Sequence, residues 1–325
     1  MPPDSGATGP TGFPHSGESG REPDALLSRR SLLQHAALAA AALGLPELLF
    51  ARTSSDPDRE RLADWAARLR AEGLAEGDVA LGRSAVRVGE LAAGTPYEPG
   101  TLDAYVRAGG NPMKAEPLTL SLTRFDCVTL VEACLAVSRV AGEAGAPSWK
   151  RFGREVERMR YRGGERRGYA SRLHYFSEWI ADGERRRLVR DLGVELGGTE
   201  DSRPLRFMTE HRGSYPALAS QRILMEIAQV ERRLDGRPRR VVPTARIAEV
   251  SDRIETGDVL AFATEIPGLD VTHAALAYRD PAGVLRVLHA PLSGGVVEVT
   301  RTTLPEYVAA IRRATGILVA RPLWA

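Results

Sequence analysis

The hydrophobic pattern divides the chain into an early helical part and a later part built of short strands. Between residues 56 and 145, apolar positions recur three and four residues apart, which is the spacing of amphipathic helices. This spacing predicts one helix that begins at residue 56 and another over 127–140. The Arg-rich segment 150–240 has the same character and is predicted to be a largely helical insertion, with an amphipathic helix over 217–234.

After Pro243 the pattern changes to short apolar and β-branched runs separated by turn residues. A last helix is predicted over 304–314. The predicted strands are 258–263, 271–278, 284–290, 296–300 and 316–321. Because helices come first and hairpin-like strands follow, the sequence predicts an α+β fold with an antiparallel sheet. Residues 53–325 are predicted to form a single domain.

The N-terminal residues differ from the rest of the chain in composition. Residues 1–27 are rich in Gly, Pro, Ser and charge without an apolar period, which is typical of a disordered tail. In the segment 28–52, Arg29 and Arg30 precede the short apolar run 36–45, and this resembles a twin-arginine export signal. The alternative is a chance arginine pair before a buried Ala-rich helix. A genuine signal implies export to the periplasm or cell envelope. The run is too short for a stable membrane span of about 20 residues.

Composition narrows the functional classes. The 325 residues are 43% hydrophobic, and 44 basic residues are offset by 42 acidic ones, so the charge does not indicate nucleic-acid binding. The two cysteines, Cys127 and Cys134, would lie about 10 Å apart on one helix, which is too far for a disulfide. Their spacing is not that of a metal site, and no metal or other cofactor is expected. Cys134 lies among apolar residues and is interpreted as part of the core.

Cys127 stands where a helix is predicted to begin. The backbone N–H groups of a helix start carry partial positive charge and favour a thiolate, the reactive form of cysteine. Asp126, directly before it, either caps this helix or contacts an amine of a ligand. The sequence therefore indicates Cys127 as a candidate nucleophile.

Two histidines fall in the predicted strand region. The strands over 271–278 and 284–290 are separated by a turn centred on Pro281, which predicts a hairpin. In that register, His273 lies directly opposite His289 on the same face, with Cβ atoms about 5 Å apart. Such a pair suits a general base and a partner that fixes its tautomer.

Several ordered blocks of the sequence resemble the DUF1460 family, a branch of the NlpC/P60 papain-like cysteine peptidases and amidases. The resemblance extends from Leu91 to the C-terminus. The segment 160–180 is peculiar to that branch. The other matching blocks are GTPY (94–97), FDC (125–127), TGDV (256–259), GLDVTH (268–273) and LHA (288–290).

The resemblance implies a papain-like core in which a helix that begins with the nucleophile packs on an antiparallel sheet. It implies N-acetylmuramoyl-L-alanine amidase activity on bacterial peptidoglycan, or on muropeptides derived from it. In the family pattern, Cys127 is the nucleophile, His273 the general base and His289 the orienting residue. Tyr97 is assigned to oxyanion stabilisation or substrate contact.

The branch-specific block supplies candidate substrate contacts. Arg172, His174 and Tyr175 lie in it, and an arginine fork binds the carboxylates of a stem peptide well. The alternative interpretation is that Tyr175 belongs to an apolar helix stripe and that Arg172 is a surface residue.

Three functions stay open at this point. The first is the secreted cysteine amidase. The second is an endopeptidase that cuts within the stem peptide, of the γ-D-glutamyl-diamino acid type, with the same catalytic residues. The third is a non-catalytic wall-binding protein on a peptidase fold, against which the retention of a candidate nucleophile and two histidines argues.

Overall fold

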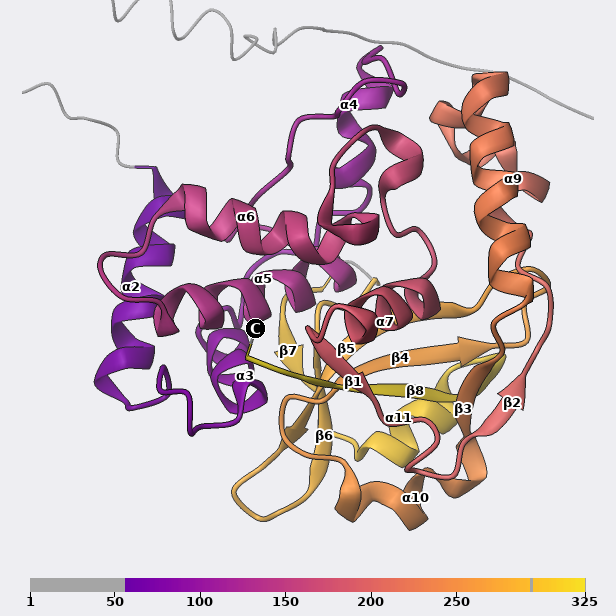
Figure 1. Ribbon diagram of the computed structural model, residues 1–325. Coiled ribbons are helices and arrows are strands. Elements are labelled where there is room, and N and C mark those ends of the chain that lie inside the picture. The colour runs from indigo at the N-terminus through magenta and orange to yellow at the C-terminus, as the bar shows by residue number, and fades with distance from the viewer. Residues whose placement is uncertain (1–55, 293–294, 325) are drawn as a thin grey trace, which may run out of the picture. The chain divides into compact units, whose positions relative to one another are not determined.

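Eight strands form one antiparallel sheet in the computed structural model, which describes residues 56–292 and 295–324 (Figure 1). Their order is β2-β3-β8-β4-β5-β6-β7, and β1 also pairs with β8. The strands are β1 (Val189–Asp191), β2 (Thr199–Asp201), β3 (Arg239–Pro243), β4 (Val259–Thr264), β5 (Val271–Arg279), β6 (Leu285–His289), β7 (Glu298–Val299) and β8 (Ala314–Pro322). This sheet confirms the predicted α+β class. The predicted tail 1–27 and export segment 28–52 lie outside the described residues.

Helices cover both faces of the sheet. On one face α5 packs against β5 with α2, α3 and α6 around it, and on the other α10 and α11 pack. The α-helices are α2 (Pro57–Ala71), α3 (Leu81–Leu91), α4 (Ala104–Arg107), α5 (Cys127–Gly142), α6 (Trp149–Arg160), α7 (Phe176–Arg185), α8 (Phe207–Glu210), α9 (Gln221–Asp235), α10 (Ile247–Val250) and α11 (Leu304–Ala310). None of the helices in the described part of the chain is long and apolar enough to span a bilayer.

The central strand β4 separates two apolar cores. Successive side chains of a strand point to opposite faces, so Val259 and Ala261 join the core under α5 while Leu260 and Phe262 join the core under α11. Because both faces are covered, every residue of β4 is buried. This burial explains why its sequence is a continuous apolar run rather than an alternating one.

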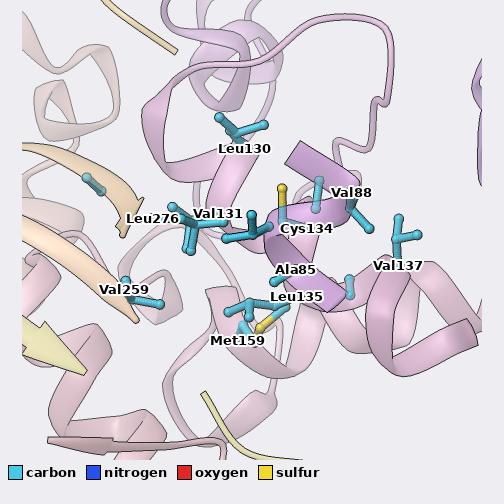
Figure 2. Packing of buried hydrophobic residues seen from close by; sticks show 14 of the residues in the cluster. Ala85, Val88, Leu130, Val131, Cys134, Leu135, Val137, Met159, Val259 and Leu276 are labelled. Atoms are coloured by element: carbon cyan, nitrogen blue, oxygen red, sulfur yellow. The ribbon is translucent and has the colours of Figure 1, made fainter. Parts of the chain in front are cut away.

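Helix α5 is the buried centre of the helical layer. All of its residues from Leu130 to Ala141 are buried, mostly apolar ones together with Glu132, Ser138 and Arg139, so this helix is covered on every side. Figure 2 shows Cys134 among the α3 and α5 side chains of this core. The prediction that Cys134 is a core residue is confirmed, and burial raises the pKa of its thiol. Both cysteines are free.

A close backbone contact joins α3 to the start of β4. Gly257 has a φ of +85°, and a Cβ there would lie 2.0 Å from the carbonyl oxygen of Gly82 in α3. A side chain at Gly257 therefore meets both a left-handed backbone and a direct clash, which only glycine avoids.

Most predicted elements are present with altered ends. The helices predicted from residue 56 and over 127–140 are α2 and α5, but the helix predicted over 304–314 ends at Ala310 because β8 already begins at Ala314. The insertion 150–240 is not purely helical, since β1 and β2 lie within it. Each of these strands has three residues, too few to show an alternating pattern.

The predicted register of the β5–β6 hairpin was wrong by two positions. Tyr278 pairs with Arg286 and Leu276 with Leu288, so the turn is centred on Ala282 rather than Pro281. Asp280 makes the difference, because its carboxylate and backbone organise a five-residue loop that closes on Val284. A shift of two keeps every side chain on its predicted face.

Candidate active site

The first turn of α5 holds Cys127 in a fixed position. Asp126 Oδ1 accepts a hydrogen bond from the Thr129 N–H at 2.8 Å, and Thr129 Oγ1 accepts one from the Asp126 N–H at 2.8 Å. This reciprocal pair is a capping box, so the predicted N-cap role of Asp126 is confirmed. Cys127 follows as the first residue of the helix.

Two opposing effects act on the Cys127 thiol. Desolvation by the surrounding protein, with a smaller contribution from Asp126, raises its pKa to about 12. Backbone N–H groups of Ala274, Val128 and Cys127 itself favour the thiolate but are outweighed. The helix start thus has the expected influence, yet the thiol is neutral at rest. The hydrogen bond from the Ala274 N–H also places the sulfur beside β5, at the residue that follows His273 in the chain.

A β-bulge directs the neighbouring histidine. Phe262 of β4 pairs with His273, whereas Ala263 pairs with Val271, so Thr272 is an extra residue in β5. Bulges bend a strand locally and re-aim side chains, and they are frequent beside active sites. The His273 ring stacks on Phe262 with ring centroids 5.7 Å apart.

The two predicted histidines are in direct contact. His273 Nε2 lies 2.9 Å from His289 Nδ1, although the corrected register makes the pair diagonal rather than directly opposite. The hydrogen bond occupies Nε2 of His273 and leaves its Nδ1 as the ring nitrogen available to an external proton. Desolvation lowers the pKa of His273 to about 3, with His289 adding to the effect, and lowers that of His289 to about 4. Both rings are therefore neutral near pH 7.

Tyr97 lies beside the helix start. Its backbone pairs with Phe125, and its N–H donates to the Gly295 carbonyl at 3.1 Å. Burial raises the pKa of its phenol to about 12, and the nearby Cys127 contributes to that shift. Tyr97, Asp126, Cys127, His273 and His289 are thus brought together from four separate segments of the chain.

Two further polar residues surround His289. The Tyr307 hydroxyl of α11 lies 3.3 Å from His289 Nδ1, and Glu298 of β7 is the register partner of His289. Burial raises the pKa of Tyr307 to about 12, and Cys127 is again among the causes. The sequence pattern of 304–314 indicated only a helix, so nothing in it singled out Tyr307. No trio of His, Cys, Asp or Glu side chains in residues 56–292 and 295–324 could hold a metal ion.

Comparison with known proteins places the chain in a family. The model of a family described as AmiA-like, N-acetylmuramoyl-L-alanine amidase-like, matches residues 87–317, which is more than half of the chain. The chain belongs to this family. None of the curated proteins compared with it matches.

Solved structures from three bacteria are similar to this amidase-like chain. An N-acetylmuramoyl-L-alanine amidase from Bacteroides uniformis is 29% identical, with a TM-score of 0.67 over 74% of this chain and 98% of its own. A Bacteroides fragilis protein named as a candidate xylanase is 31% identical, with a TM-score of 0.65 over 72% and 99%. Protein LPG0564 from Legionella pneumophila, of the DUF1460 family, is 16% identical, with a TM-score of 0.57 over 82% and 94%, and shows the fold alone.

The branch-specific residues of this amidase-like chain have mainly internal partners. Arg172 is buried rather than exposed, and its guanidinium binds Glu116 at 2.8 Å and Asp103 at 3.1 Å. Tyr175 is buried and donates to Glu231 at 2.7 Å. These contacts favour structural roles for both, and their contact with substrate stays a prediction.

His174 completes that block. Its Nε2 lies 2.9 Å from the Tyr169 carbonyl oxygen, and its ring packs on the Tyr169 ring with centroids 4.6 Å apart. Desolvation, with Arg172 nearby, lowers its pKa to about 3. Substrate contact by His174 also stays a prediction.

Proposed function

We propose that the protein is an exported cysteine hydrolase that cleaves the amide bond between the lactyl group of N-acetylmuramic acid and L-alanine in peptidoglycan. The observation that carries this proposal is the His273–His289 hydrogen bond beside a helix-starting cysteine, in a chain of the amidase-like family. We assign the fold to the papain-like NlpC/P60 type, because a nucleophile at a helix start packed on an antiparallel sheet is the arrangement of that type.

The neutral resting state defines the first chemical step. As the Cys127 sulfur attacks the lactyl carbonyl carbon, the thiol proton passes to Nδ1 of His273. The resulting imidazolium donates from Nε2 to Nδ1 of His289, which stabilises it. Because the charges arise only during attack, the desolvated site does not have to hold a thiolate at rest.

The remaining steps use the same groups. The oxyanion of the tetrahedral intermediate accepts from the Cys127 backbone N–H at the helix start, with the Tyr97 hydroxyl as a second donor. The C–N bond then breaks, His273 returns the proton to the leaving L-alanine nitrogen, and the lactyl group stays on sulfur as a thioester. Water, deprotonated by His273, hydrolyses the thioester and regenerates the thiol.

Product analysis tests this function. A disaccharide muropeptide with a three-residue stem is incubated with the wild type, with Cys127→Ala and with Cys134→Ala, and the products are identified by mass spectrometry. We expect a free lactyl carboxylate and an intact tripeptide from the wild type and from Cys134→Ala, and nothing from Cys127→Ala. A shortened stem still attached to the sugar would favour the endopeptidase. If the wild type cleaves no bond of the muropeptide, the result would favour the wall-binding protein.

Export is a separate proposal, since residues 28–52 lie outside the described structure. We propose that Arg29 and Arg30 direct the folded protein to the twin-arginine pathway. Replacing both arginines with lysine should leave the protein in the cytoplasm of a host that exports the wild type. Equal export of the two forms would contradict the signal.

A further inference from the structure

Within the part of the chain that the structure describes, Nε2 of His289 has no hydrogen-bond partner. The side chain is only 2% exposed, yet Nε2 is a buried polar atom for which no residue in the described ranges supplies a donor or acceptor within hydrogen-bond distance. Buried polar groups of proteins nearly always have a hydrogen-bond partner, so we expect a nearby side chain that can reach this buried nitrogen.

Glu298 is placed to be that partner. It stands directly opposite His289 in the β6–β7 pair, and its Oε1 lies 3.9 Å from His289 Nε2. The carboxylate side chain is 55% exposed, and within residues 56–292 and 295–324 no other hydrogen bond holds its Oε1. A side-chain rotation that moves Oε1 by about 1 Å would therefore bring it within hydrogen-bond distance of His289 Nε2.

The proton positions on the two rings show why this contact matters. For His273 to accept a proton at Nδ1, its own hydrogen must be on Nε2, and His289 Nδ1 must then be an acceptor. A neutral His289 with an unprotonated Nδ1 carries its hydrogen on Nε2. The reverse arrangement, with hydrogen on Nδ1 of both rings, leaves His273 unable to act as base.

Tyr307 does not settle the choice alone. Its hydroxyl lies 3.3 Å from Nδ1 of His289 and can donate to that nitrogen or accept from it. A carboxylate is different, because when ionised it only accepts hydrogen bonds. Glu298 beside Nε2 is therefore compatible with only one of the two tautomers.

We propose that Glu298 is a positioning residue, which accepts a hydrogen bond from His289 Nε2 and thereby holds the His273–His289 pair in the tautomer that leaves His273 Nδ1 free to take the thiol proton. The inference rests on the proposed function for its kinetic consequence only. The tautomer itself is a property of the protein without substrate.

The discriminating variant is Glu298→Gln. Glutamine has the same shape but can also donate a hydrogen bond, so it stabilises the wrong tautomer as well as the right one. With a muropeptide substrate we expect kcat to fall about 10-fold with KM unchanged, a smaller effect than the about 10⁴-fold known for a fully buried orienting carboxylate because Glu298 is half exposed. Glu298→Asp should recover part of kcat. Glu200→Gln, on the exposed strand β2, is the matched control and should behave as wild type.

The substrate-free readout is the ¹⁵N spectrum of the histidine side chains, assigned with a His289→Gln variant. We expect Nε2-protonated His289 in the wild type and a mixture of tautomers in Glu298→Gln, at equal melting temperature. An unchanged tautomer in Glu298→Gln, or a kcat within twofold of wild type, would overturn the inference. If the wild type cleaves nothing, the proposed function fails, and the spectrum still decides the role of Glu298.

Discussion

Two buried histidines of this protein have a pKa shifted in the same direction, but their surroundings allow different chemistry. His174 and His273 both have a pKa lowered to about 3, mainly by desolvation. Nε2 of His174 faces a backbone carbonyl, and its ring packs on Tyr169, whereas Nε2 of His273 is bound by a second imidazole, and the next residue, Ala274, contacts the Cys127 sulfur. A lowered pKa therefore reports burial, and the available nitrogen beside a nucleophile marks the candidate base.

Removing the imidazole ring of His273 or of His174 gives the strongest test of this comparison. We expect His273→Ala to lose at least 10³-fold in kcat/KM, because a general base and its nucleophile act as one unit. His174→Gln should keep kcat/KM within about 10-fold and lose melting temperature instead. Muropeptide cleavage followed by liquid chromatography measures the first effect, and a thermal melt the second. Equal losses of activity in both variants would remove the distinction.

The ion pairs beside His174 allow a second test. Arg172→Met leaves the Glu116 carboxylate buried without its guanidinium, which should cost about 3–5 kcal/mol of unfolding free energy. The control is Arg167→Met, an exposed arginine paired with the exposed Glu165, which should change stability by less than about 1 kcal/mol. Urea unfolding measures both. A stable Arg172→Met protein with a greatly raised KM would show substrate contact instead.

The dependence of stability on pH tests what the two histidine surroundings share, because burial acts on the rings of both in the same way. The rings of His174, His273 and His289 are neutral when folded but titrate near pH 6.5 when unfolded. The unfolded state therefore binds more protons below pH 6.5. The contribution of these rings to the free energy of unfolding is fully present above that pH. It is lost as the pH falls toward 4, at about 1.4 kcal/mol per pH unit for each ring.

Unfolding curves at pH 7, 5.5 and 4.5 measure this loss, and His174→Gln should reduce the slope by about 1.4 kcal/mol per pH unit, the share of one ring. A wild-type stability that rises on acidification would contradict neutral folded histidines.

The smallest expected effect belongs to Tyr307. Tyr307→Phe removes a hydroxyl that lies 3.3 Å from His289 Nδ1, and the loss of one such hydrogen bond should lower kcat about threefold. Tyr278→Phe, at the far end of β5, should leave kcat unchanged. A fall of more than 100-fold in Tyr307→Phe would assign the hydroxyl to the reacting groups.

Local sequence patterns predicted the placement of Cys127, His273 and His289 better than the contacts around them. Cys127 at a capped helix start and two histidines on one hairpin face could be read from local patterns, because caps and strand alternation involve near neighbours. The register was wrong because the Asp280 loop depends on side-chain hydrogen bonds. Glu298 and Tyr307 meet His289 only through the fold, and the neutral thiol follows from burial, which no local pattern reports.

The central claim is that Cys127 carries the sugar half of the substrate as a thioester. The most direct measurement is the intact mass of the enzyme after rapid acid quenching with a disaccharide muropeptide, followed by mapping of the modified peptide. We expect a mass gain equal to the disaccharide with its lactyl acyl group, located on the peptide that contains Cys127. A gain equal to a fragment of the stem peptide, or the disaccharide acyl group on a residue other than Cys127, would contradict the account.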